Sequence, residues 1–103
     1  MSITIVRYRP KPDRAAENQR LIEEVFSELN QTRPDGLRYA AFRLDDGTFL
    51  HVAEIGTDSN PLASSPAFAR FTEGIAGRCE AGEGPNPRGA LLVGSYELMN
   101  ETN

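Results

Sequence analysis

The stretch LRYAAFRLDDGTFLHVAEI, residues 37–55, contains two short apolar runs that are separated by Asp-Asp-Gly-Thr. An Asp-Gly pair between two strand-like runs is a strong local signal for a β-hairpin. The stretch therefore predicts one strand at residues 37–44 and a second at residues 49–55. These strands lie at the centre of the chain, so the elements on either side of them decide the fold.

A two-residue loop at positions 46 and 47 would set the register of this hairpin, and with it which side chains share a face. It places Phe42 opposite His51 and Tyr39 opposite Glu54. One face then holds Ala40, Phe42, Leu44, Phe49, His51, Ala53 and Ile55, and the other holds Tyr39, Ala41, Arg43, Leu50, Val52 and Glu54. A slip of one residue would change these cross-strand partners.

Helical periodicity appears on both sides of the hairpin. Asp13 is predicted to cap the first helix, and Pro-Asp-Gly at 34–36 ends it. Its apolar stripe consists of Ala16, Leu21, Ile22, Val25, Phe26 and Leu29. Ser65 is predicted to cap the second helix, with Pro66 at its first position. The face of this helix continues through Phe68, Phe71, Thr72, Ile75 and Cys79.

Two further strands are predicted at the ends of the chain, at residues 3–9 and 90–98. Residues 80–89 are rich in Gly and Pro and have no periodicity, which predicts a flexible loop. The resulting βαββαβ order predicts an α+β, ferredoxin-like fold, with both helices on one face of a four-stranded antiparallel sheet. A length of 103 residues predicts a single domain over residues 1–103.

The strands carry apolar residues on both faces, at 3–6, 37–42 and 91–93. An antiparallel sheet with one face in water should instead alternate between apolar and polar residues. Two helices on one side cannot cover the other, so a second copy of the chain is expected there. The sequence therefore predicts a homodimer that pairs sheet to sheet.

Composition narrows the classes of partner and the compartment. The formal net charge of −4 disfavours binding to nucleic acid or to an anionic membrane surface. Cys79 is the only cysteine, so no intramolecular disulfide can form, which suits a reducing cytoplasm. No signal peptide or membrane-spanning run is expected. With one His, one Cys and no phosphate-binding loop, neither a metal nor a nucleotide or other cofactor is expected.

Three stretches carry a resemblance to a known family: IVRYRPKP at 5–12, FRLDDG at 42–47 and SPAFARF at 65–71. With the order of elements, they resemble the dimeric α/β-barrel superfamily, and most closely its antibiotic-biosynthesis-monooxygenase-like domains. The resemblance covers nearly the whole chain and implies that two ferredoxin-like subunits form a shared barrel. The superfamily includes cofactor-free oxygenases of polycyclic aromatic substrates, haem-degrading enzymes and lactone isomerases, so the fold alone does not give the reaction.

The catalytic residues of that superfamily mostly find no counterpart in this chain. Its haem-degrading branch uses an Asn, a Trp and a His, whereas this chain has no Trp and its first strand ends in Arg-Tyr-Arg at 7–9. The aromatic oxygenases use a Trp and an Asn near the third strand and second helix. Asn60 lies in that region, but no Trp follows it. Haem degradation is therefore disfavoured, and no catalytic residue is carried over.

The remaining candidates follow from the residues themselves. His51, the only histidine, can act as a general base near neutral pH, although a histidine inside an apolar strand is more often a hydrogen-bonded core residue. Asn18 could reach a cavity between sheet and helices, or could be an ordinary exposed helix residue. Phe68 and Phe71 could contact a ligand, although their spacing suits core packing better.

Charged groups near the strand ends have two possible roles. Arg43, Tyr39 and Glu54 share a face on the predicted register, where Arg43 and Glu54 would form ion pairs with a dimer partner or bind an anionic substrate. Arg7 and Tyr8 allow the same two interpretations. Cys79 is expected to be a buried structural residue, although the neighbouring Arg78 could lower its pKa.

Two functions from different classes fit these residues. The first is a cofactor-independent monooxygenase or isomerase acting on a small apolar or aromatic molecule, with His51 as proton acceptor and Arg43 or Arg7 stabilising an anion. In this case Asn18, Tyr39, Phe68 and Phe71 bind the ligand. The alternative is a non-catalytic module for small-molecule binding or assembly. An open cavity lined by His51 favours the first, and a filled cavity with His51 tied to backbone carbonyls favours the second.

Overall fold

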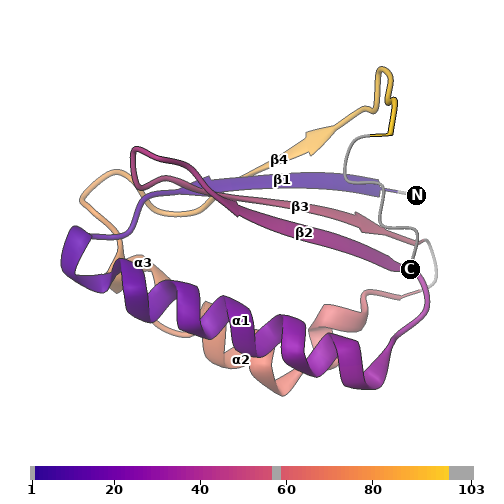
Figure 1. Cartoon of the computed structure of the whole chain (residues 1–103), viewed down its shortest axis with the longest axis horizontal. Coiled ribbons are helices and arrows are strands. Elements are labelled where there is room, and N and C mark those ends of the chain that lie inside the picture. The colour runs from indigo at the N-terminus through magenta and orange to yellow at the C-terminus, as the bar shows by residue number, and fades with distance from the viewer. Residues whose placement is uncertain (1, 57–58, 98–103) are drawn as a thin grey trace.

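The computed structural model describes residues 2–56 and 59–97, which form one four-stranded sheet and a layer of helices (Figure 1). In chain order the elements are β1 (Ser2–Tyr8), η1 (Pro12–Arg14), α1 (Ala15–Thr32), β2 (Leu37–Arg43), β3 (Phe49–Ile55), η2 (Pro61–Ser64), α2 (Pro66–Thr72), α3 (Ile75–Arg78) and β4 (Asn86–Ala90). The strand order is β2-β3-β1-β4, and all neighbours are antiparallel. This arrangement confirms the ferredoxin-like α+β prediction.

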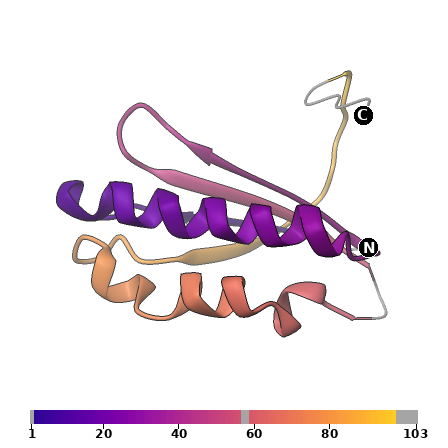
Figure 2. The same ribbon diagram turned by 60° about the horizontal axis from the view of Figure 1, so that its bottom comes forward.

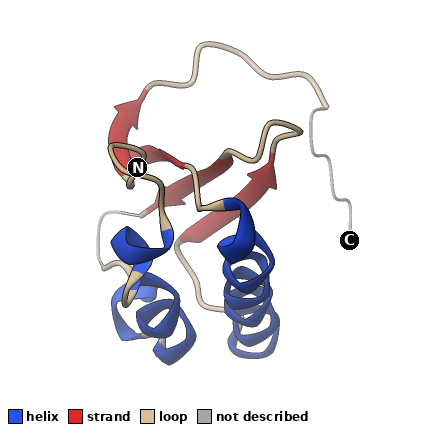
Figure 3. Cartoon of the chain, turned by 90° about the vertical axis from the view of Figure 1, so that its left-hand side faces the viewer, coloured by secondary structure: helices blue, strands red, loops and turns tan. Residues whose placement is uncertain are grey.

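All the helices lie on one side of the sheet, as the end-on view in Figure 3 shows. Helices α1 and α2 run side by side and pack against each other (Figure 2). The core between the layers contains Tyr8, Val25, Phe49 and Phe71, each at most 4% exposed. The helices bury the inner face of the sheet because their apolar stripes point toward it.

The opposite, outer face of the sheet has no helix against it. Its side chains include Ile3, Ile5, Ala40, Phe42, Leu50 and Val52, and all six are only half-buried. The inner face carries Val6, Tyr8, Tyr39, Ala41, Phe49, His51 and Ala53. Apolar side chains therefore lie on both faces of the sheet, as the strand patterns predicted.

The predicted hairpin register is wrong by one residue. His51 pairs with Ala41 instead of Phe42, and Arg38, not Tyr39, pairs with Glu54. The consequence is large because side chains alternate between faces. Tyr39, Ala41 and Arg43 lie on the same face as His51, the inner one, while Ala40 and Phe42 lie on the outer face.

The register differs because the hairpin loop has three residues instead of two. The backbone N–H of Leu44 donates to the carbonyl of Thr48 at 2.8 Å, and that of Gly47 donates to the carbonyl of Leu44 at 3.1 Å. Gly47 has a φ of 92°, which is in the left-handed region. A type I turn followed by a left-handed Gly is the usual three-residue hairpin loop, and an Asp-Asp-Gly sequence suits it as well as the two-residue loop.

The helix starts match the predictions in one case and not in the other. Ser65 caps α2, since its Oγ accepts the backbone N–H of Phe68 at 3.0 Å. Asp13 does not cap α1: it lies inside η1, and α1 begins one residue after Arg14 without a side-chain cap. Pro12 favours this outcome because it starts a tight turn ahead of the helix.

The last strand lies earlier than predicted. β4 occupies Asn86–Ala90, so its first four residues fall in the stretch predicted as a flexible loop and only Ala90 belongs to the predicted strand. Residues 91–97 of the predicted strand have no regular structure, and residue 98 lies outside the described ranges. β4 is an edge strand beside β1, where Pro87 is tolerated because one side of the strand needs no hydrogen bonds. Leu91 and Val93 are 87% and 95% exposed.

Within the described ranges, none of the helices combines the length and the apolar character that crossing a bilayer requires.

Candidate functional site

A cavity of about 370 Å³ lies between the inner face of the sheet and the α2–α3 segment. Side-chain alternation along β1 and β3 directs Val6, Tyr8, His51 and Ala53 toward it. Phe68 and Phe71 of α2 form much of the opposite wall. The walls are thus mostly apolar, and His51 with the hydroxyls of two tyrosines forms a polar corner.

His51 is 4% exposed and is hydrogen-bonded at both ring nitrogens. Its Nε2 lies 2.8 Å from the hydroxyl of Tyr8, and its Nδ1 lies 2.6 Å from the hydroxyl of Tyr39. Burial lowers the pKa of His51 to about 4, because the charged imidazolium would lose its hydration. The imidazole is therefore neutral at pH 7.

Burial acts in the opposite sense on the two tyrosines. It raises the pKa of Tyr8 and of Tyr39 well above the usual phenol range, since the charged form of a phenol is the anion. For Tyr8 the hydrogen bond from Asn18 acts the other way but is the smaller effect. At neutral pH the corner thus holds three neutral groups that both donate and accept hydrogen bonds.

The hydrogen-bond chain continues from Tyr8 away from the cavity. Asn18 on α1 is fully buried, and its Nδ2 donates to the Tyr8 hydroxyl at 2.9 Å. Its Oδ1 accepts from Nε of Arg78 at 3.2 Å. The amide therefore links the cavity corner to a buried guanidinium.

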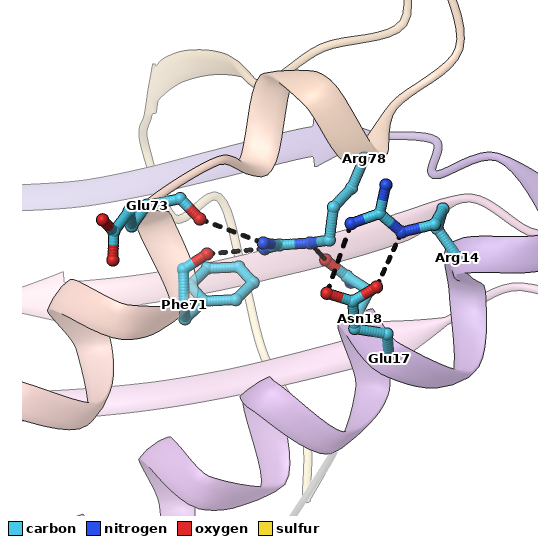
Figure 4. A network of polar contacts seen from close by, with 6 residues as sticks. All are labelled: Arg14, Glu17, Asn18, Phe71, Glu73 and Arg78. Carbon is cyan, nitrogen blue, oxygen red and sulfur yellow. Dashed lines mark hydrogen bonds and ion pairs between the residues drawn. The ribbon is translucent and has the colours of Figure 1, made fainter.

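Arg78 is 3% exposed, and its side chain lies between α1 and the end of α2 (Figure 4). It donates to the carbonyls of Phe71 at 2.5 Å and Glu73 at 3.1 Å, and its guanidinium lies 5.6 Å from the centroid of the Phe71 ring. Glu17, drawn beside it, is bonded instead to Arg14 at 2.6 Å. None of the ion pairs in the described parts of the chain includes Arg78, so neutral oxygens at the negative end of α2 solvate this cation.

The structure brings four of the predicted site residues to the cavity: His51, Tyr39, Phe68 and Phe71. Asn18 does not line it, and contacts the site through Tyr8. The cavity is open and lined by His51, whose partners are tyrosine hydroxyls and not backbone carbonyls.

Arg43 and Arg7 lie elsewhere. The guanidinium of Arg43 bonds Gln19 at 2.8 Å, lies over the Phe49 ring and does not line the cavity. Arg7 is exposed, on the outer-face side of β1.

The sequence did not assign Arg78 to the site, and it considered Tyr8 only as an interface or anion-binding residue. Tyr8 stands at the end of a strand beside two arginines, and nothing local shows that its ring points inward. Arg78 follows a Gly-containing segment and has the pattern of a solvated helix end. Only the long-range contact with Asn18, sixty residues away in the chain, marks it as buried.

Cys79 is buried and free, as expected of a structural cysteine. Burial raises the pKa of its thiol more than the neighbouring Arg78 lowers it. In residues 2–56 and 59–97, no three potential metal ligands among His, Cys, Asp and Glu gather in one place.

The chain resembles known proteins in its fold but not in its sequence. No known protein-family profile matches the sequence, and no curated protein matches it. Several solved structures share the fold. The Mycobacterium tuberculosis protein Rv0793 is 15% identical, with a TM-score of 0.71 over 91% of this chain and 96% of that one.

Two further neighbours carry a functional name. A candidate antibiotic biosynthesis monooxygenase from Nitrosomonas europaea is 15% identical, with a TM-score of 0.71 over 90% of this chain and 99% of that one. One from Deinococcus radiodurans is 13% identical, with a TM-score of 0.67 over 96% and 99%. This chain therefore has the ferredoxin-like fold of the proteins named antibiotic biosynthesis monooxygenases, which confirms the expected architecture. At these identities the likeness concerns the fold alone.

Proposed function

We propose that this protein binds a small apolar or aromatic molecule in the helix-side cavity and acts on it as a cofactor-independent monooxygenase or isomerase. One observation carries the proposal: a neutral histidine lies at the polar corner of an otherwise apolar cavity of about 370 Å³. Such a cavity is typical of sites that bury most of a small ligand and orient it by a few polar groups. The names of the structural neighbours agree with this function.

In this proposal His51 and Tyr39 hold or move a proton at an oxygen of the substrate. Monooxygenation and isomerisation can both start with removal of a proton from an acidic substrate position next to an aromatic ring or a carbonyl. The imidazole is neutral at pH 7 and can accept a proton, but burial lowers its pKa to about 4 and so makes it a weaker base than an exposed histidine. Tyr39 and His51 both line the cavity, so a substrate held there lies next to the phenol and the imidazole. Arg43 has no part in this step because its guanidinium lies outside the cavity.

A non-catalytic binding module is the second candidate, and a specific observation favours it. Both ring nitrogens of His51 already have tyrosine partners, which leaves no free lone pair for a substrate proton. In that case the corner serves only to bind and orient a ligand.

The test begins with native mass spectrometry of freshly purified protein, which reports the mass of any retained small molecule. That molecule, or a panel of phenols and hydroquinones if none is retained, is then incubated with the protein while oxygen consumption and product mass are followed. We expect turnover that His51→Ala abolishes. Turnover unchanged in His51→Ala would contradict the enzyme proposal, and binding without turnover would support the module.

We further propose that the protein is a homodimer that pairs through the outer face of the sheet, in the cytoplasm. The half-buried side chains of Ile5, Phe42 and Val52 on this face support the dimer, because a helix-free apolar sheet face is rarely left in water. The free, buried Cys79 is compatible with a reducing compartment.

A further inference from the structure

The donor and the acceptor of each hydrogen bond at the cavity corner can be assigned, starting from Arg78. A guanidinium has N–H donors and no acceptor. The atom of Asn18 that faces Nε of Arg78 must therefore be the carbonyl oxygen Oδ1, at 3.2 Å. The amide group Nδ2 then faces the hydroxyl of Tyr8 and donates to it at 2.9 Å.

The same reasoning assigns the donor in the hydrogen bond between Tyr8 and His51. The Tyr8 oxygen accepts from Asn18, so the single Tyr8 proton needs another acceptor. Tyr8 is 2% exposed, and within the described residues its hydroxyl bonds only Asn18 and Nε2 of His51. A buried donor without a partner is unfavourable, so Tyr8 donates to Nε2.

The tautomer of His51 decides which group donates in its hydrogen bond with Tyr39. An imidazole that accepts at Nε2 and is neutral carries its proton on Nδ1. Nδ1–H then donates to the Tyr39 oxygen at 2.6 Å. The Tyr39 hydroxyl proton stands at the end of the chain, on a side chain that lines the cavity, and bonds no other described residue.

We propose that the Tyr39 hydroxyl is the hydrogen-bond donor of this cavity, and that the ligand carries an acceptor oxygen such as a ketone or quinone carbonyl. Asn18 and Arg78 are positioning residues: they do not touch the ligand, but they set the direction of every proton between them and Tyr39. This inference rests on the proposed function, that the cavity binds a small molecule. It adds the substrate class, since a hydrogen bond to a carbonyl would also stabilise negative charge that develops on its oxygen.

The direction is tested on the protein without ligand, through the tautomer of its only histidine. Long-range ¹H–¹⁵N NMR correlation distinguishes an Nδ1–H from an Nε2–H imidazole, and a single histidine leaves no ambiguity of assignment. We expect the Nδ1–H tautomer in the wild-type protein at pH 7. The Nε2–H tautomer would overturn the proposal, because Tyr39 would then donate to His51 and not into the cavity.

Asn18→Asp reverses the chain while conserving shape. One carboxylate oxygen pairs with Arg78, and the other accepts the proton of Tyr8. Tyr8 then accepts from Nε2, and Tyr39 donates to Nδ1. We expect the Nε2–H tautomer in this variant and the wild-type tautomer in Gln31→Glu, which makes the same amide-to-acid change at an exposed site on α1. An unchanged tautomer in Asn18→Asp would show that Asn18 does not set the direction.

The ligand class is tested with three bicyclic probes of similar shape: 1-tetralone, 1-tetralol and tetralin. Binding is measured by NMR titration of the wild type, Asn18→Asp and Gln31→Glu. We expect wild type and Gln31→Glu to bind the ketone about tenfold more tightly than the alcohol, as one unsatisfied buried hydrogen-bonding group implies. In Asn18→Asp we expect the alcohol to bind more tightly than the ketone.

The outcomes separate this inference from the proposed function. If the three probes bind with equal affinity to the wild type, the ligand class is wrong and the binding cavity stands. If none binds, the proposed binding function fails and the ligand class with it, while the tautomer still decides the direction of the chain.

Discussion

A buried histidine between two buried tyrosines makes stability depend on pH. Unfolding exposes His51, so its pKa rises from about 4 in the folded protein to 6.5 in the unfolded chain. The groups facing it are the neutral phenols of Tyr8 and Tyr39, with the Arg78 cation beyond Asn18. Between these two pKa values the unfolded state binds more protons than the folded state.

We therefore expect the free energy of unfolding to fall as the pH drops from about 6.5 to about 4, by roughly 3 kcal/mol in total from this residue. His51→Gln keeps hydrogen-bonding capacity but cannot take up a proton in this range. Urea unfolding at several pH values should show a gap between wild type and variant that changes across this window. A constant gap would contradict the depressed pKa, and the comparison cancels the titration of the carboxylates.

Arg78 is a buried cation whose guanidinium bonds three separate oxygen acceptors. Arg78→Lys keeps the positive charge, but one ammonium group cannot reach Asn18, Phe71 and Glu73 together. We expect it to destabilise the protein by roughly 2–4 kcal/mol, because buried acceptors lose their donors. The midpoint of urea unfolding measures this loss.

Arg70→Lys is the matched control for that variant. Arg70 lies on α2, just before the α3 turn that carries Arg78, but its side chain is 58% exposed and its carboxylate contact, with Glu24, is 3.9 Å. Its midpoint should stay that of the wild type. Equal effects of the two substitutions would mean that the buried contacts of Arg78 contribute little.

At the scale of elements, the start of α2 depends on a contact with α1. Ser65 caps the helix, and the carboxylate of Glu28 on α1 accepts both the Ser65 hydroxyl at 2.6 Å and the backbone N–H of Ala67 at 3.0 Å. These bonds lower the pKa of Glu28, the one from Ser65 most. They attach the segment that carries Phe68 and Phe71 to the longer helix.

Ser65→Ala removes the cap and one partner of Glu28. We expect a loss of about 1–2 kcal/mol in the free energy of unfolding, the usual range for an N-cap. Ser64→Ala is the control, since the Ser64 hydroxyl is exposed and bonds only the carbonyl of Pro61 in its own turn. Chemical denaturation of both variants decides the point, and equal midpoints would contradict the role of the cap.

Prediction of the elements from sequence succeeded where the signal was local and failed where two local solutions compete. The Ser-Pro helix start and the central hairpin follow from residues next to one another. The hairpin register could not be predicted in this way, because Asp-Asp-Gly suits loops of two and of three residues. The choice of loop decides which side chains of one strand share a face with those of the other. β4 was missed because an edge strand tolerates Gly and Pro, which elsewhere mark a loop.

At the scale of the whole molecule, the outer face of the sheet carries apolar side chains that none of the described helices covers. Val52 stands at its middle, between Ile5 on β1 and Ala40 on β2. We expect Val52→Glu to convert the proposed dimer to a monomer, because a charge buried in an apolar interface has no partner. Sedimentation equilibrium measures the change.

Gln31→Glu adds the same charge at an exposed position of α1 and should remain dimeric. A wild-type protein that is monomeric at micromolar concentration would contradict the dimer. A Val52→Glu variant that stays dimeric would instead place the interface elsewhere on the molecule.

The sequence alone determined the class of fold and the two-faced sheet. These follow from periodicity, order of elements and composition, which are local properties of the chain. Only the tertiary structure decided what His51 contacts: Tyr8 from β1, Tyr39 from β2, and beyond them Asn18 and Arg78. The hydrogen-bonded pairs of this chain are 10 to 60 residues apart in sequence, and a one-residue shift in the hairpin would have turned Tyr39 away. The physical reason is that side-chain direction depends on strand register, and strand register depends on the packing of the whole fold.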